Sequence, residues 1–277
     1  MAEQSDQERY KQEDLMANGP VSRGASNNSA PMNKDDSHPS IAGNSSRINE
    51  QKIMVSGGTV QLEAILGTPV DARALIVFAY YRIGSSENIL SNLSVLAAMC
   101  RSAGLSTLVV NLLTPEDEEL DKTTLFFREN ISVLHQRVIG IVNWLIANVN
   151  TQNMGFGYFG ADVCAAAILA ASAVRPDAMN AIVAVAPSTE LVNSYLPRIV
   201  APTLIIAPER DAQALNMYRT SISAIASDTN LDIVTQARQR GLTNNLEIIP
   251  GVQNAFENNQ SLSKVGELTT GWFTHFL

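Results

Sequence analysis

The sequence predicts an α/β protein with a doubly wound, mostly parallel sheet that opens with an antiparallel hairpin. Apolar runs typical of buried strands alternate with helical stretches from residue 74 to the end of the chain. Two β-like runs flank Gly57-Gly58, which is a hairpin signal. Polar side chains follow several of the apolar runs, at the edge where sheets of this class bind their ligands.

The predicted elements follow one another in the order that this architecture requires. The hairpin strands are residues 52–56 and 59–68, and apolar residues alternate along the second as on a half-solvated antiparallel edge. Buried strands are then expected at residues 74–79, 105–110, 154–159, 180–186, 202–207 and 245–249. Helices are expected at residues 88–103, 128–149, 163–171, from 212 onward, 228–241 and 261–276. Ser85 and Ser86 are candidate caps for the first helix, and Gly104 ends it.

Residues 1–50 differ in composition from the rest of the chain. They are rich in Ser, Asn, Asp, Gln and Gly and poor in aromatic and β-branched residues. Such a segment buries too little apolar surface to offset the entropy of ordering, so we expect a disordered polar tail. It is either a solvating segment or an arm that binds a partner. Residues 51–277 are expected to form one large α/β domain.

Charge and composition exclude several functional classes. The net charge of −8, without a Lys/Arg cluster, argues against nucleic acid as a partner. There is no apolar run of membrane-spanning length, and the charged beginning of the chain does not resemble a signal peptide, so we expect no membrane contact and a cytoplasmic location. Cys100 and Cys164 lack metal-site spacing, and the five carboxylates of residues 113–122 fit no calcium loop, which favours a solvated loop. We therefore expect no metal and no cofactor.

The stretch from Met154 to Ala171 contains the most informative motif. A short aromatic strand, a glycine and a run of small apolar helical residues follow one another, as in a nucleophile elbow. The elbow pattern is Gly-x-nucleophile-x-Gly, and the sequence here is Gly160-Ala161-Asp162-Val163-Cys164. Asp162 therefore occupies the nucleophile position, and the backbone N–H of Val163 is the expected oxyanion donor.

From about residue 53 to 277 the chain resembles the dienelactone hydrolase-like group of the α/β-hydrolase superfamily. Five stretches carry the resemblance in combination: IVFAYYRIGSS, LVVNLLTPEDEE, GYFGADVCAAA, PTLIIAPERD and LEIIPGVQNAFEN. The resemblance implies an α/β-hydrolase fold. It also implies a triad in which Asp162 stands at the nucleophile, Asp211 at the acid and Asn254 at the histidine position.

The same resemblance points to the loop after the first central strand. Active relatives have His-Gly there, where this chain has Tyr80-Tyr81. We expect these two rings to crowd the oxyanion site. An ionised Asp162 is also expected to repel the developing negative charge. Arg82 is a candidate to neutralise Asp162 as a buried pair, although a solvent-exposed arginine is the alternative.

The remaining candidate groups offer little support for catalysis. Asn254 cannot take up a proton near neutral pH, and His38, His135 and His275 do not follow a strand. Cys164 as a shifted nucleophile would place β-branched Val163 in the tight turn, so a buried core thiol is favoured.

The functional expectation is therefore a catalytically inactive hydrolase-fold protein, a pseudohydrolase. It would act as a binding or regulatory protein for a protein partner or a small-molecule ligand. The alternative is a hydrolase of the dienelactone hydrolase or dehalogenase type, with Asp162 as nucleophile or base on an ester, lactone or alkyl substrate. A third hypothesis is a binding module that holds its ligand through Asp162 and Asn254. The sequence does not determine whether the chain forms a homo-oligomer.

Overall fold

The computed structural model describes residues 49–82 and 87–277. The predicted disordered tail lies outside the described residues except for its last two positions, and so do His38 and the candidate caps Ser85 and Ser86. Among the described helices, none is both long enough and apolar enough to cross a lipid bilayer.

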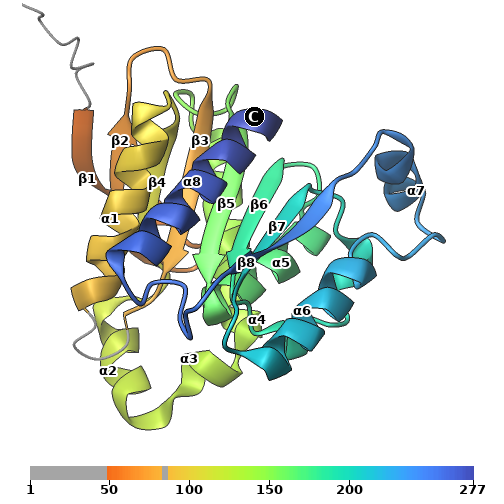
Figure 1. The fold of residues 1–277 in the computed structure, drawn as a ribbon. Coiled ribbons are helices and arrows are strands. Elements are labelled where there is room, and N and C mark those ends of the chain that lie inside the picture. The colour runs from red at the N-terminus through yellow and green to blue at the C-terminus, as the bar shows by residue number, and fades with distance from the viewer. Residues whose placement is uncertain (1–48, 83–86) are drawn as a thin grey trace, which may run out of the picture. The chain divides into compact units, whose positions relative to one another are not determined.

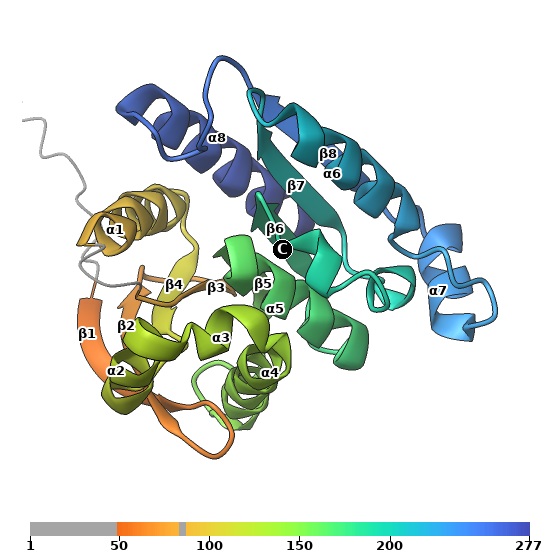
Figure 2. The same ribbon diagram turned by 90° about the horizontal axis from the view of Figure 1, so that it is seen from below.

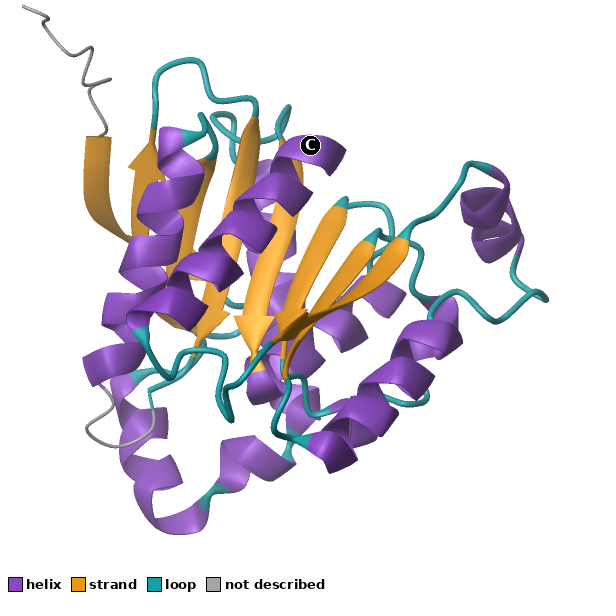
Figure 3. Ribbon diagram, in the orientation of Figure 1, coloured by secondary structure: helices purple, strands orange, loops and turns teal. Residues whose placement is uncertain are grey.

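The described residues form one mixed sheet with the order β1-β2-β4-β3-β5-β6-β7-β8. The strands are β1 (Asn49–Ser56), β2 (Gln61–Thr68), β3 (Ala74–Tyr80), β4 (Ser106–Asn111), β5 (Gly155–Ala161), β6 (Ala181–Val185), β7 (Thr203–Pro208) and β8 (Asn244–Ile249). β2 pairs antiparallel with β1 and β4, whereas β3 to β8 all run parallel to one another. The predicted doubly wound, mostly parallel sheet with an N-terminal antiparallel hairpin is therefore confirmed (Figure 3).

Helices cover both faces of the sheet (Figures 1 and 2). They are α1 (Glu87–Ser102), α2 (Pro115–Thr124), α3 (Phe126–Glu129), α4 (Ile131–Ala147), α5 (Asp162–Val174), α6 (Ala212–Ala224), α7 (Asp232–Gln239) and α8 (Asn259–Phe276), with 3-10 turns at Thr189–Leu191 and Leu196–Arg198. α1 and α8 pack side by side on one face, and α4, α5 and α6 lie on the other. Each face buries its own apolar cluster, because the central strands are covered on both sides.

The strand order places a topological switch point beside β3. The chain leaves β3 for β4 on one side and returns to β5 on the other, so the loops after β3 and β5 diverge there. Ala79 pairs with Gly160 in the register of β3 and β5. The residues that follow, Tyr80-Tyr81 and Ala161-Asp162, therefore leave the sheet side by side.

Three expectations about elements need correction. The edge strand is β1 and not β2, because β2 lies between β1 and β4. The predicted alternation along β2 is confirmed, since exposed and buried residues alternate from Gln61 to Ala64. The single helix predicted for 128–149 is two helices, α3 and α4, which are separated at Asn130. The acidic stretch predicted to be a solvated loop is helix α2, which Thr114 begins with a capping box to Asp117.

Candidate functional site

The turn between β5 and α5 has the backbone of a nucleophile elbow. Asp162 has a φ of 52°, in the left-handed region that non-glycine residues rarely adopt. A Cβ at Gly160 would lie 2.8 Å from the backbone nitrogen of Ala165, so strand and helix approach each other as closely as the motif requires. The elbow predicted from the sequence is therefore present, with Asp162 at its tip.

Asp162 is exposed, and a neighbouring loop fixes its carboxylate. The hydroxyl of Ser188, three residues beyond β6, donates a hydrogen bond of 2.6 Å to Oδ1 of Asp162. Sequence reasoning missed Ser188. The available signal was its position just past the carboxyl end of a parallel strand, where functional polar residues collect.

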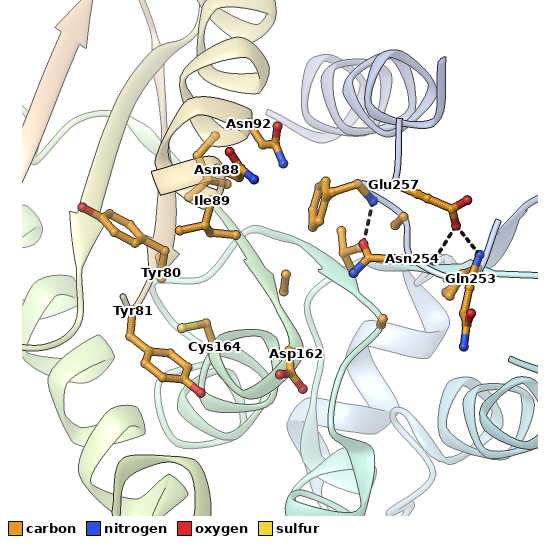
Figure 4. Close-up of a pocket in the computed structure, with 18 of the residues that line it drawn as sticks. Tyr80, Tyr81, Asn88, Ile89, Asn92, Asp162, Cys164, Gln253, Asn254 and Glu257 are labelled. Atoms are coloured by element: carbon orange, nitrogen blue, oxygen red, sulfur yellow. Dashed lines mark hydrogen bonds between the residues drawn. The ribbon is translucent and has the colours of Figure 1, made fainter. Parts of the chain in front are cut away.

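A cavity of about 520 Å³ opens at the elbow (Figure 4). Tyr80, Tyr81, Asp162, Asp211 and Asn254 all line it, so the structure brings most of the sequence-predicted site residues together. Arg82 and Val163 are not among its lining residues. Sequence reasoning missed Asn88 and Asn92 of α1 and Gln253 and Glu257 of the loop before α8, which also line it.

The two tyrosines do not close the cavity. Figure 4 shows the ring of Tyr80 directed away from Asp162 and the ring of Tyr81 beside Cys164. The expected crowding is thus not found, because both rings pack sideways into the protein, where they are 8% and 6% exposed. Burial raises the pKa of both phenols. For Tyr81, the charges of Asp162 and Asp121 act in the same direction, and the charge of Arg128 opposes them. The Tyr81 hydroxyl has no hydrogen-bond partner in the part of the chain that the structure describes.

Cys164 is a buried thiol at the contact between strand and helix. Burial raises its pKa strongly, and the negative charge of Asp162 adds to the effect. A hydrogen bond from the backbone amide of Tyr81 opposes them in part. A thiol held protonated in this way is a poor nucleophile, because the thiolate is the reactive form.

Asp211 and Asn254 both make local structural hydrogen bonds. Asp211 is the N-cap of α6, and its Oδ1 accepts a hydrogen bond of 3.0 Å from the amide of Ala214. Oδ1 of Asn254 accepts a hydrogen bond of 2.8 Å from the amide of Phe256 in its own loop (Figure 4). Glu257 stabilises the same loop, since the amides of Gln253 and Asn254 donate to its Oε2 at 2.7 and 3.4 Å. These bonds lower the pKa of Glu257.

Arg82 does not form the suggested pair with Asp162. Its side chain is 46% exposed and lies 3.8 Å from the carboxylate of Glu118 on α2, and it also interacts with the hydroxyl of Tyr80. The physical reason is that α2 brings its acidic first turn next to the loop after β3, so Arg82 has a carboxylate partner away from the elbow.

Two other acidic residues of α2, Asp117 and Asp121, are also bound by protein groups. Asp117 pairs with Arg137 at 2.7 Å, and Oδ1 of Asp121 accepts a hydrogen bond of 2.9 Å from the amide of Phe127. Within the described ranges, no cluster of His, Cys, Asp and Glu side chains could hold a metal ion.

The histidines with described positions lie away from the cavity. His135 is buried in α4, and its Nδ1 is 3.3 Å from the carbonyl oxygen of Ile131, one turn earlier. His275 is in the last turn of α8. Neither side chain lines the cavity, so neither supplies a base at Asp162.

The negative charges of the site raise the pKa of one buried phenol, that of Tyr218. Burial, followed by the charges of Asp211, Asp162 and Glu190 in that order, raises the pKa of Tyr218 on α6 to about 12. The electrostatic potential around the elbow is therefore negative.

Comparison with known proteins finds solved structures that are similar to this chain. The chain is similar to the crystal structure of a dienelactone hydrolase from Anabaena variabilis, with 31% identity, a TM-score of 0.72, and coverage of 83% of this chain and 99% of that one. Est1E from Butyrivibrio proteoclasticus has 11% identity and a TM-score of 0.62, which shows a shared fold alone. No protein-family model matches the sequence.

Two curated relatives come from strains of Mycobacterium tuberculosis and carry the name "Putative phosphoribosyl transferase". They are 30% identical over 230 residues, which is 83% of this chain and 47% of each relative. The chain thus spans about half the length of the curated relatives it matches.

Proposed function

Because the chain belongs to the dienelactone hydrolase-like group of the α/β-hydrolase superfamily, we propose that it keeps the ligand cavity of this fold without the hydrolytic chemistry. The protein binds a small molecule at the elbow and does not turn it over. One observation carries the proposal. A cavity of about 520 Å³ is retained around an elbow whose histidine position holds Asn254, hydrogen-bonded to its own loop.

The state of each catalytic position supports this function. Acyl transfer needs a nucleophile deprotonated by a neighbouring base, and the residues lining the cavity include no histidine. The carboxylate of Asp162 adds a negative charge where an oxyanion would form.

The size and lining of the cavity support ligand binding. Its volume lies within the range of small-molecule sites, which is about 300 to 1,000 Å³. Apolar side chains such as Ile89, Leu93 and Phe256 form part of its wall, and a few amide and carboxylate groups converge on it.

The test combines turnover with binding. We expect a panel of aryl esters, lactones and haloalkanes to give no turnover above buffer. Turnover that Asp162→Ala abolishes would overturn the proposal. For binding, Ile89→Trp fills the cavity from α1, whereas Ile146→Trp places the same ring on the exposed face of α4. Compounds that raise the melting temperature of the wild type should still do so in Ile146→Trp and fail in Ile89→Trp.

A second function is favoured by the backbone at the elbow. Asp162 keeps a positive φ, and such strain persists at sites where it serves a purpose. The alternative is that a carboxylate oxygen of Asp162 attacks an alkyl carbon, the carbon–halogen bond breaks and halide leaves, so that an ester remains on the protein. Without a histidine to activate water, that ester would accumulate. Intact-mass spectra after haloalkane exposure test this, and an unmodified mass rules it out.

We do not extend phosphoribosyl transfer to this chain. More than half of each mycobacterial relative lies outside the matched region, so that name can describe a part that the match does not include.

A further inference from the structure

Amide side chains are the commonest polar groups around the cavity at the elbow. Those of Asn88, Asn92, Gln253 and Asn254 line it together with three carboxylates. Among the described residues, no Lys, Arg or His lines it. An anionic ligand would therefore meet like charge without a cation to pair with, which disfavours its binding.

Two asparagines of α1 lie together on one wall of the cavity. Asn88 and Asn92 are four positions apart, so they share one face of the helix, and Figure 4 shows their amide groups at the cavity. Each amide carries an acceptor oxygen and a nitrogen with two N–H donors. This wall can therefore both donate hydrogen bonds to a ligand and accept them from it.

The loop before α8 presents a donor whose direction the protein already fixes. Oδ1 of Asn254 accepts a hydrogen bond of 2.8 Å from the amide of Phe256, which leaves the side-chain nitrogen of Asn254 for a ligand. Glu257 holds the backbone of the same loop through the amides of Gln253 and Asn254. Because this loop is ordered without a ligand, binding to it costs less entropy.

The elbow adds an acceptor that is fixed in the same way. Oδ1 of Asp162 accepts the hydroxyl of Ser188 at 2.6 Å, which leaves Oδ2 for a ligand. An ionised carboxylate only accepts hydrogen bonds, whereas the amide nitrogen of Asn254 only donates them. A ligand that reaches both groups must therefore offer both a donor and an acceptor.

Hydroxyl groups meet this requirement better than charged groups do. An ammonium group donates only and would leave the amide nitrogens without an acceptor, and a carboxylate accepts only. A hydroxyl group does both, so it pairs with the asparagine amides and with Asp162 alike. Since these groups lie on α1, on the loop before α8 and on the elbow, the ligand needs hydroxyl groups on several sides of its body.

The apolar part of the lining suits the C–H face of a ring. Ile89 and Leu93 of α1 and Phe256 of the loop before α8 contribute apolar surface. Phe256 is also the residue whose amide orients Asn254, so an apolar surface and a hydrogen-bond donor are presented by the same turn of chain. A ring with hydroxyl groups at its edge and C–H groups on its face matches that arrangement.

We propose that the cavity binds a neutral monosaccharide, with its hydroxyl groups on Asn92, Asn254 and Asp162 and its C–H face against the apolar surface. This inference rests on the proposed binding function and names its ligand class. Neutral planar side chains give the affinity, and the uncompensated carboxylates exclude acidic sugars.

The experiment is a ligand-observed NMR titration of the full chain with D-glucose, D-galactose, D-mannose and D-ribose. We expect at least one of them to bind. The uronic acid of the sugar that binds should bind about tenfold more weakly, because it carries a negative charge into the cavity. Cyclohexanol has a similar ring but a single hydroxyl group, and it should also bind about tenfold more weakly.

Asn92→Leu removes the donors and the acceptor of one amide while nearly keeping its volume, and it should weaken the sugar about threefold to tenfold. Asn216→Leu is the matched control, because Asn216 is exposed on α6 and does not line the cavity. It should leave sugar affinity unchanged. An equal loss in both variants would contradict the assigned site.

Asp162→Asn tests the exclusion of acidic sugars. It removes one negative charge and keeps an acceptor oxygen, so the neutral sugar should still bind and its advantage over the uronic acid should shrink about threefold or more. An unchanged advantage would contradict the role of Asp162 in that exclusion.

The outcomes separate the two proposals. If none of the four sugars binds, or if cyclohexanol binds as tightly, the monosaccharide proposal is overturned. Should other compounds still raise the melting temperature of the wild type and fail in Ile89→Trp, the binding function stands without this ligand class. Ester turnover that depends on Asp162 would overturn the binding function itself.

Discussion

The hydroxyl of Ser188 and the carboxylate of Asp162 are joined by a hydrogen bond of 2.6 Å between residues 26 positions apart in the sequence. The amide of Ser188 also lies 3.4 Å from the carbonyl oxygen of Asp162. The loop after β6 therefore fastens the tip of the elbow after β5. This contact fixes the direction of the carboxylate, although the carboxylate itself is exposed.

We expect Ser188→Ala to lower the free energy of unfolding by about 1 kcal/mol, because the hydrogen bond is charge-assisted but solvent-exposed. Asp162→Asn removes the charge and should make the serine substitution less costly. A double-mutant cycle in urea measures the coupling, which we expect at about 0.5 to 1 kcal/mol. Additive losses would mean that the contact does not stabilise the protein.

The backbone at Asp162 predicts an inverted order of two substitutions. At a φ of 52°, glycine is tolerated and alanine is strained, so Asp162→Gly should be about 1 kcal/mol more stable than Asp162→Ala. Exposed Asn216 within α6 is the control, where glycine should be about 1 kcal/mol less stable than alanine. Thermal unfolding of the four variants checks both signs, and the same sign at both positions would contradict the elbow geometry.

The contact between β5 and α5 makes Gly160 hard to replace. An added methyl group would lie 2.8 Å from the backbone nitrogen of Ala165 and 2.9 Å from the carbonyl carbon of Cys164, and backbone cannot yield as a side chain can. We expect Gly160→Ala to cost about 1 to 3 kcal/mol. Gly271 in α8 has open space around it, so Gly271→Ala should instead stabilise by up to about 1 kcal/mol. Chemical denaturation distinguishes the two, and similar effects would argue against the tight contact.

The sequence was sufficient to predict the sheet and the elbow because both depend on local signals. Uninterrupted apolar runs predicted the central strands, and the order of strand, Gly160 and small helical residues predicted the turn at Asp162. The acidic stretch was harder, because α2 depends on the Thr114 capping box and on ion pairs with Arg82 and Arg137. Charge composition alone did not show those partners.

The candidate site was only partly predictable for the same reason. Family-like motifs brought Asp162, Asp211 and Asn254 to one edge of the sheet, where all three line the cavity. Side-chain directions depend on tertiary packing. The sideways rings of Tyr80 and Tyr81 could therefore not be derived from their position after β3.

The buried arginine of α4 is predicted to hold α2 in place. Arg137 pairs with Asp117 at 2.7 Å, donates to the carbonyl oxygen of Leu112 at 2.5 Å and lies over the ring of Phe127. Arg137→Met leaves these partners unpaired, so we expect a loss of about 3 to 5 kcal/mol in the free energy of unfolding. Lys122→Met removes an exposed pair on α2 and should cost less than about 1 kcal/mol. Equal costs in urea titrations would refute a structural role for the buried pair.

Tyr218 reports the negative charge of the site through its ionisation. Its pKa is raised from 10.0 to about 12 by burial first and then by Asp211, Asp162 and Glu190. Because the folded-state pKa is the higher one, this phenol contributes its full stability below pH 10.0 and loses it as the pH rises toward about 12. The loss between these values should be smaller in Tyr218→Phe, and stability curves over this alkaline range measure it.

The same phenol provides a direct measure of the charge at Asp162. Alkaline titration of tyrosinate absorbance, with Tyr218→Phe as the difference reference, should show the Tyr218 pKa falling in Asp162→Asn, because one of the charges that raise it is removed. Asp71 is exposed, has a φ of 61° and is not among the causes of that shift, so Asp71→Asn should leave the titration unchanged. If both variants or neither shift the titration of Tyr218, the charge of Asp162 is not a specific cause of the raised Tyr218 pKa.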